Sequence, residues 1–232
     1  MKRSEIQSAI AFSLEQTRQN GFMLPRFAYW DIDMWIKHID EIDSITKTML
    51  GWDVTDFGNG DFHKLGAVLF TIRNGLIDNR NIGTPYAEKI IVLEPGQRLP
   101  IHMHKTKSED IVSRSGGAFE IRLWNITPGG NPDTESPVRV YRDGMLHEVE
   151  AGAPFHITNG NSITLHPYLL HSFGCADNSE PSIIGEISSI NNDMTDNFFA
   201  EPVSRFTYIE EDEELRWILC NEYNLLNEMC AD

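Results

Sequence analysis

The chain is poor in cysteine and in basic residues, and both shortages narrow the classes of protein to which it can belong. It has 3 cysteines, Cys175, Cys220 and Cys230, and no CxxC pair. An odd number without paired spacing predicts free thiols in a reducing compartment, not a disulfide framework. Lysine and arginine total 19 against 35 acidic residues, a formal net charge of −16. Because nucleic acids and anionic membranes bind basic surfaces, we expect neither as a partner.

Long apolar runs are missing as well. No stretch approaches the roughly 20 apolar residues that a helix needs to cross a bilayer. The opening segment MKRSEIQSAIAFSLEQ has basic residues at its start, but Gln7, Ser8 and Ser13 interrupt its apolar part. This is not the pattern of a secretory signal. We therefore expect a cytoplasmic protein.

The sequence divides into an N-terminal region with a helical pattern and a longer region with the pattern of short strands and turns. In residues 4–20, apolar Ile6, Ile10 and Leu14 recur every four residues, which predicts an amphipathic helix. Residues 51–61 are rich in turn formers and are predicted to form a loop. From residue 62 onward, short apolar runs alternate with turn signals roughly every ten residues, as in an antiparallel sandwich or barrel. No internal repeat or linker interrupts the chain, so we expect a mainly β fold in one domain over 1–232, with a helical cap over 1–60 and a barrel core over 62–190.

The segment PIHMHKTKSEDI, residues 100–111, concentrates titratable side chains between apolar residues. His102 and His104 are two apart, so a strand places them on the same face. A hairpin turn at about residues 105–108 returns Glu109 to that face, and Lys107 then points into the same space. Imidazole and carboxylate groups are common ligands of divalent metals. The segment predicts a metal site, although a lone HxH pair is also found in strands that bind no metal.

A fourth ligand must come from another part of the chain. The stretch SITLHPYLLHSFG offers His166 or His171. His171 is the better candidate because it follows a proline-containing turn and opens an apolar strand, whereas His166 lies at the turn itself. Three histidines and one carboxylate leave two positions of an octahedron for substrate or water.

The spacing of these residues resembles a known pattern. The first cupin motif, G-x5-H-x-H-x4-E-x6-G, is matched at every defined position by Gly96, His102, His104, Glu109 and Gly116. HPYLLHSF resembles the second cupin motif, with Tyr168 to Leu170 in place of the usual Pro-Gly turn. The resemblance implies the cupin double-stranded β-helix, a jelly-roll barrel that binds its metal inside.

Longer stretches resemble the bacterial D-lyxose isomerases nearly from end to end. They are MKRSEI, LPRFAYW, YAEKIIVLEPGQ, HMHKTKSEDI, GEISSINNDMTDNFF and RFTYIEEDEELRWILCNEY. The resemblance implies a homodimeric aldose–ketose isomerase that interconverts D-lyxose and D-xylulose, and often D-mannose and D-fructose. It also implies one divalent metal per chain, Mn²⁺ first, with Co²⁺, Zn²⁺ or Fe²⁺ as alternatives.

The same resemblance implies roles for individual residues. The metal ligands are His102, His104, Glu109 and His171. Lys107 and Glu201 are the acid and base that move protons through an enediol intermediate, and Lys89 lies in the substrate pocket. A lysine beside a divalent cation should have its ammonium form destabilised, which eases proton donation. Glu186, which alternates with Ser188, and Arg205, four residues after Glu201, are further candidates for substrate binding.

Two other functions fit the same ligand set. A cupin iron-dependent dioxygenase uses such ligands to activate oxygen, which leaves Lys107 and Glu201 without a role. A non-catalytic sugar-binding cupin binds a pentose without turnover. Many chemistries share the barrel, so the motif alone does not choose among them.

Overall fold

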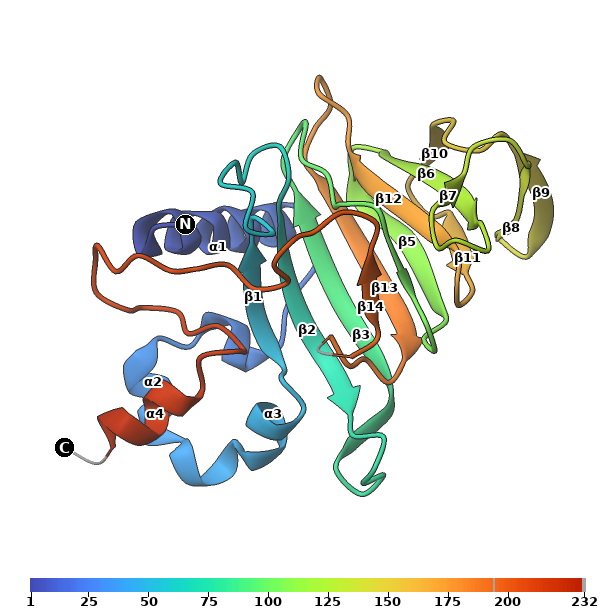
Figure 1. Ribbon diagram of the computed structural model, residues 1–232. Helices are drawn as coiled ribbons and strands as arrows, with labels where there is room; N and C mark the ends of the chain where they lie inside the picture. Colours follow the sequence, from blue (N-terminus) through green and yellow to red (C-terminus); the bar gives the residue numbers. More distant parts are fainter. Residues whose placement is uncertain (194, 231–232) are drawn as a thin grey trace.

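The chain folds into two antiparallel β-sheets with helices on one flank, as the computed structural model shows (Figure 1). The structure describes residues 1–193 and 195–230. Its helices are α1 (Arg3–Gln19), α2 (Ile32–Lys37), α3 (Asp43–Lys47) and α4 (Asn224–Met229), with two 3-10 turns, η1 (Arg26–Tyr29) and η2 (Ile39–Glu41). Within the described residues, no helix has both the length and the apolarity to cross a membrane.

The larger sheet has eight strands in the spatial order β1-β2-β3-β13-β5-β11-β8-β9. Their bounds are β1 (Gly51–Thr55), β2 (Ala67–Gly75), β3 (Gly83–Leu93), β13 (Ser182–Ser189), β5 (Glu109–Gly116), β11 (Ser162–Leu165), β8 (Val138–Arg142) and β9 (Met145–Val149). The second sheet has the order β10-β6-β12-β4-β14, and β7 pairs with β6. Its bounds are β10 (Phe155–Ile157), β6 (Phe119–Ile126), β12 (Leu170–Cys175), β4 (His102–His104), β14 (Asn197–Phe199) and β7 (Pro132–Asp133).

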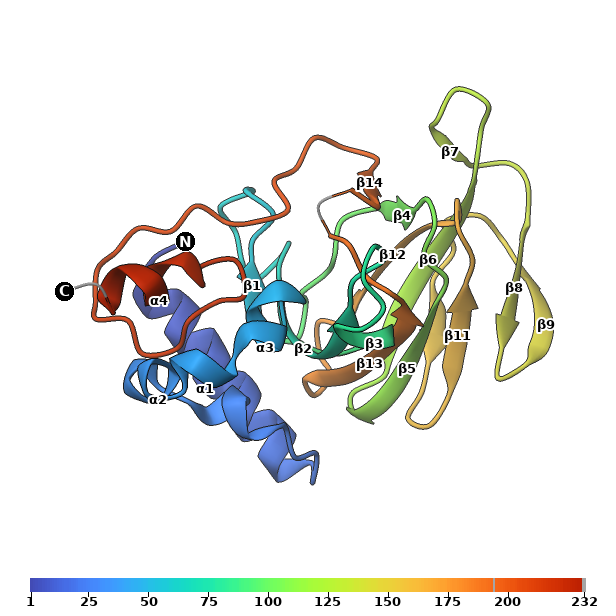
Figure 2. The ribbon, with the colours of Figure 1, turned by 90° about the horizontal axis from the view of Figure 1, so that it is seen from below.

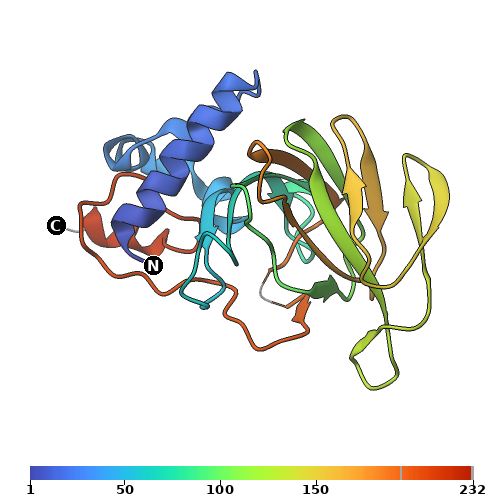
Figure 3. The ribbon, with the colours of Figure 1, turned by 90° about the horizontal axis from the view of Figure 1, so that it is seen from above.

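The two sheets share one apolar core. Along β6, Phe119, Ile121 and Leu123 are buried while the residues between them are half-buried, the period-two pattern of a strand. They pack with residues of the facing sheet such as Ile91 and Ile111. Figure 2 shows the sheets curling round this common interior, and Figure 3 shows the β8–β9 hairpin at the end away from the helices. The predicted fold class, a mainly β cupin barrel with N-terminal helices, is confirmed.

Helix α1 packs on the outer face of the larger sheet at its β1–β3 end. Ile6 and Ile10 of α1 are fully buried in a second cluster with Phe70 of β2 and Ile90 of β3. Those strands are therefore buried on both faces, which explains their continuous apolar runs. Arg3, also fully buried, forms ion pairs at 2.6 Å with Glu211 and with Glu222, and so holds the C-terminal segment against the helix.

Strands also form before residue 62 and after residue 190. Residues 51–61 were expected as a loop, but Gly51–Thr55 form β1, whose five residues are all buried. They pair with β2 on one side and lie under α1, so tertiary packing outweighs the local turn formers. At the other end, β14 lies beyond residue 190 and pairs with β4. The division into 1–60 and 62–190 stays a prediction.

Candidate functional site

Strand pairing brings the predicted metal ligands together from both sheets. His102 and His104 lie on β4, and His171 on β12 lies directly opposite His102. Glu109 begins β5, which belongs to the other sheet. The predicted hairpin is therefore wrong: residues 105–108 cross between the sheets, because β4 pairs with β12 and β14 while β5 pairs with β11 and β13. The crossing still returns Glu109 to the histidines.

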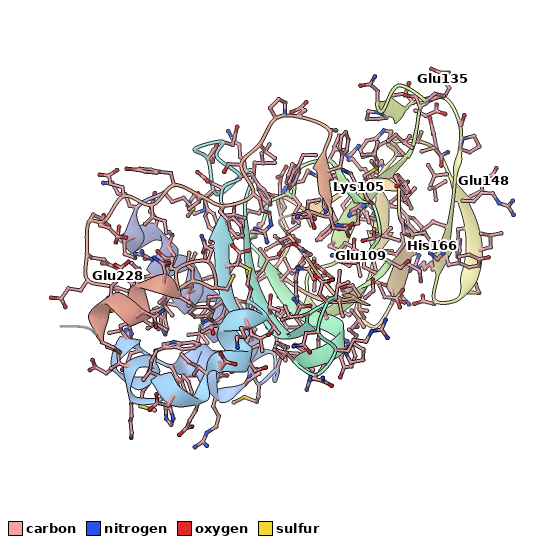
Figure 4. All side chains as sticks on the ribbon, turned by 60° about the horizontal axis from the view of Figure 1, so that its bottom comes forward. Lys105, Glu109, Glu135, Glu148, His166 and Glu228 are labelled. Atoms are coloured by element: carbon pink, nitrogen blue, oxygen red, sulfur yellow. The ribbon has the colours of Figure 1, made fainter. Side chains whose placement is uncertain are left out.

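The four side chains meet in the barrel interior. One ring nitrogen of each of the three histidines lies within 4.8 Å of the others, and all three residues are buried. Glu109 lies 3.5 Å from Nε2 of His104 through Oε2, and 3.2 Å from Nε2 of His171 through Oε1. Figure 4 shows Glu109 in the middle of the fold and the exposed His166 nearer to the β8–β9 hairpin.

The donor set fits a divalent metal. Nδ1 of His102 donates to the Pro100 carbonyl and Nδ1 of His171 to the Leu169 carbonyl, each at 2.9 Å, so Nε2 of both rings is left as a lone-pair donor. Buried Nε2 of His171 and Oε1 of Glu109 face each other at 3.2 Å, and neither atom has another partner among the described residues. Burial, together with the two neighbouring histidines, holds the pKa of His102 well below its usual range. Neutral imidazoles beside an ionised carboxylate are what such an ion binds.

Lys107 lies between two carboxylates beside the ligand cluster. Its Nζ is 2.8 Å from Oε2 of Glu109 and 2.8 Å from Oε1 of Glu186. Burial opposes its charge, but Glu109, Glu186 and Asp193 outweigh that effect and raise its pKa above the ordinary value. This direction comes from the neighbouring side chains alone. The expectation that a bound cation destabilises the ammonium form stays a prediction. Glu186 is likewise buried, yet Lys107 and Lys89 lower its pKa, so it is ionised.

The charged contacts continue away from the ligand cluster. Lys89 lies opposite Glu186 in the sheet, and its Nζ is 3.5 Å from Glu186 and 3.6 Å from Asp193. Arg205 then lies 2.9 Å from Asp193 and 2.6 Å from Asp53. Lys89, Glu186 and Arg205 were predicted for the pocket and are here joined in one network. Asp193 and Asp53 were missed; Asp193 lies in GEISSINNDMTDNFF, a stretch that already carried the family resemblance.

A second carboxylate missed by the sequence analysis holds the crossing segment. Asp196, which is buried, accepts hydrogen bonds from the backbone N–H groups of Lys105, Thr106 and Lys107 and from the Thr106 hydroxyl, at 2.7 to 3.1 Å. Its Oδ2 also lies 3.9 Å from Nδ1 of His104. Asp196 thus fixes the turn that joins one predicted ligand to the next.

Glu201, the predicted base, lies away from this network. Its side chain is exposed in the segment after β14, and no hydrogen bond or ion pair joins it to another described residue. Arg205, four residues further on, contacts Asp53 and Asp193 and not Glu201. The catalytic role of Glu201 stays a prediction from the resemblance.

Two adjoining cavities give access to these groups. The inner one has a volume of about 40 Å³ and is lined by His102, His104, Lys107, Glu109 and Glu186. The outer one has a volume of about 460 Å³. Leu69, Lys89, Asp193 and Arg205 line both. The two cavities therefore adjoin at these shared residues, next to the ligand cluster.

Comparisons with known proteins identify the family of the chain. The sequence matches the family described as D-lyxose isomerase over residues 1–223. It is 36% identical over 225 residues to a D-lyxose/D-mannose isomerase of Escherichia coli O157:H7, covering 96% of this chain and 98% of that protein. It is 39% identical over 224 residues to the protein of the same name from Serratia proteamaculans, covering 93% and 96%.

The fold also has solved counterparts. An L-ribose isomerase from Cellulomonas parahominis, without ligand, superposes with a TM-score of 0.57 at 15% identity, covering 90% of this chain and 98% of that one. Identity this low shows a shared fold alone. The family match and the two relatives span almost the whole chain, and the chain therefore belongs to the D-lyxose isomerase family of sugar isomerases.

Proposed function

We propose that this chain is a metal-dependent aldose–ketose isomerase that interconverts D-lyxose and D-xylulose, and D-mannose and D-fructose. The names of the two relatives support the substrates. The observation that carries the proposal is the position of Lys107, 2.8 Å from both Glu109 and Glu186. A protonated donor and an ionised carboxylate thus lie side by side next to four predicted metal ligands, as proton transfer between neighbouring carbons requires.

The proposed ion is one divalent metal per chain, with Mn²⁺ as the preferred candidate and Co²⁺, Zn²⁺ or Fe²⁺ as alternatives. His102, His104, Glu109 and His171 would hold it, and the convergence of their buried nitrogen and oxygen atoms supports this assignment. When bound, such an ion supplies Lewis-acid polarisation of the sugar's carbonyl and neighbouring hydroxyl oxygens.

The remaining groups handle protons and position the sugar. In place of Glu201, which is exposed, we assign Glu186 as the base that takes the proton from C2 and returns it to C1 through an enediol, because Glu186 is ionised and lines the inner cavity. Lys107, kept protonated by its neighbours, donates its proton to the C1 oxygen as charge develops there and takes up the proton that the C2 hydroxyl loses as the ketone forms, so that it ends protonated again. Lys89 and Arg205 bind hydroxyl groups on the sugar carbons beyond C2. The homodimer implied by the resemblance and the cytoplasmic location expected from the sequence composition remain part of this proposal.

The test is to strip the metal with a chelator, restore Mn²⁺ and assay a panel of aldoses for ketose formation. Ketose from D-lyxose and D-mannose is expected only in the restored protein. His104→Ala and Glu109→Ala should abolish the restored activity, whereas His166→Ala, an exposed histidine outside the site, should retain it. Oxygen consumption without ketose would instead support the dioxygenase, and pentose binding without turnover would support the sugar-binding protein.

A further inference from the structure

A row of cross-strand neighbours leads from the inner cavity into the outer one. Glu186 on β13 lies opposite Lys89 on β3, and Lys89 lies opposite Thr71 on β2. Directly opposed residues of antiparallel strands project to the same face, so these side chains all face the interior. Glu186 lines the inner cavity, Lys89 lines both, and Thr71 lines the outer cavity. The register of the sheet therefore sets a path between the cavities.

The two volumes show how a sugar must lie along this path. A water molecule needs about 10–15 Å³ of such volume. The inner cavity, at about 40 Å³, thus holds roughly three waters. That space suits the two reacting carbons of an open-chain sugar and their oxygens. The rest of the carbon chain has to continue past Lys89 into the outer cavity, whose volume is about 460 Å³.

The wall at this junction carries polar groups that are incompletely paired. The ion contacts of Lys89 are 3.5 and 3.6 Å long, beyond normal hydrogen bonds. Nη1 of Arg205 is buried and has no hydrogen-bond partner in the described part of the chain. Thr71 is 6% exposed, and its hydroxyl makes no side-chain hydrogen bond to residues 1–193 or 195–230. Hydroxyl groups of a polyol can both donate and accept, so they suit these groups.

We propose that the outer cavity receives the far end of an open-chain aldose and that the Thr71 hydroxyl hydrogen-bonds to it, which makes Thr71 a determinant of chain length. The inference rests on the proposed isomerase function and adds a residue that distinguishes six-carbon from five-carbon sugars. A five-carbon chain reaches Lys89 and Arg205. The additional carbon and hydroxyl of a hexose extend to Thr71.

Thr71→Val and Thr71→Ser test the proposal through kcat/KM for D-mannose and D-lyxose. Valine has the shape of threonine but no hydroxyl, so D-mannose should lose about 10-fold and D-lyxose less than about 2-fold, in line with one lost hydrogen bond. Serine keeps the hydroxyl and should restore the wild-type ratio of the two sugars. Thr164→Val, on β11 and outside both cavities, should leave that ratio unchanged. An equal loss for both sugars, or no loss for either, would overturn the role of Thr71.

A binding measurement separates this proposal from the isomerase assignment. D-Arabinitol and D-mannitol have the carbon skeletons of D-lyxose and D-mannose but no carbonyl group, so they bind without turnover. Calorimetry on the Mn²⁺-loaded protein should show a weaker affinity of Thr71→Val for D-mannitol and an unchanged affinity for D-arabinitol. If the wild-type protein makes no ketose but Thr71→Val still binds D-mannitol more weakly than wild type does, the isomerase proposal fails and the cavity assignment stands. Unchanged D-mannitol affinity in Thr71→Val would refute the cavity assignment.

Discussion

The carboxylate of Asp196 accepts a hydrogen bond from the backbone N–H of Lys107 at 3.1 Å. The same carboxylate accepts from Lys105 and Thr106, and it approaches Nδ1 of His104 to 3.9 Å. One side chain from the segment before β14 thus holds the turn that positions both a predicted metal ligand and the proposed proton donor.

Asp196→Asn is expected to weaken Mn²⁺ binding about 10- to 100-fold, the range found when groups that orient metal ligands are changed. Asparagine has one acceptor oxygen where aspartate has two, so the turn cannot be held at both oxygens. Competition between Mn²⁺ and a fluorescent chelator measures the affinity directly. Thr106→Val, which removes only the hydroxyl contact to Asp196, is the matched control and should change the affinity much less. Equal affinities in wild type and Asp196→Asn would contradict the positioning role.

Glu186 and Glu201 compete for the role of base, and their glutamine variants decide between them. Glu186→Gln should lower turnover about 10²- to 10⁴-fold, the usual contribution of a positioned acid or base. Glu201→Gln should stay near wild type because that side chain is exposed and away from the cavities. Turnover is measured with Mn²⁺ saturating. Low turnover in Glu201→Gln with near wild-type turnover in Glu186→Gln would instead identify Glu201 as the base.

The enediol route itself makes a prediction about hydrogen. In D₂O, a base such as Glu186 that exchanges its proton with solvent should place deuterium on C1 or C2 of the product, detectable by NMR. Complete retention of the original hydrogen would instead mean a hydride shift between the carbons, and Glu186 would then only bind the sugar.

The sequence predicts most of the ligand cluster and much less of its surroundings. His102 and His104 follow from strand alternation, and the cupin spacing adds Glu109. Asp193 and Asp53 could not be derived in this way, because they come from distant segments that meet only through tertiary packing. Neither belongs to a spacing pattern, and an isolated aspartate is more often a surface residue.

The sheet topology could not be predicted from local sequence patterns either. Alternation and turn signals predict that the chain reverses between His104 and Glu109, but not whether it pairs with itself or crosses to another sheet. The crossing depends on β12 and β14 occupying both edges of β4, contacts that are remote in sequence. The burial of β1 on both faces likewise depends on α1.

His171 provides a test of whether the ion lies where the ligands converge. Mn²⁺ should raise the Tm of the metal-free protein, since an ion that binds only the folded state stabilises it by about 2.7 kcal/mol at 100 times its Kd. His171→Ala should lose most of this shift in a thermal melt, whereas His166→Ala should keep it. The same Mn²⁺ shift in His171→Ala and wild type would mean that the ion binds elsewhere.

The stability of the turn before the inner cavity should depend on pH through Asp56. Its carboxylate accepts from the N–H groups of Gly58 and Gly60 and from the Thr207 hydroxyl. Burial alone would raise its pKa, but these hydrogen bonds lower it below the ordinary 3.8. The bonds also hold Phe57, which lines the inner cavity at a φ of 52°.

A carboxyl whose pKa is lowered in the folded state stabilises the fold above its unfolded pKa, and that stability is lost as the pH falls through the folded value. Asp56→Asn should therefore be about 1.5–3 kcal/mol less stable than wild type at pH 7, the range for hydrogen bonds to a charged group. The difference should shrink once the pH falls below about 3.8. Urea unfolding at several pH values measures it, with Asp40→Asn, an exposed aspartate, as the control. A difference that is the same at every pH would show that shape, and not charge, explains the effect of Asp56.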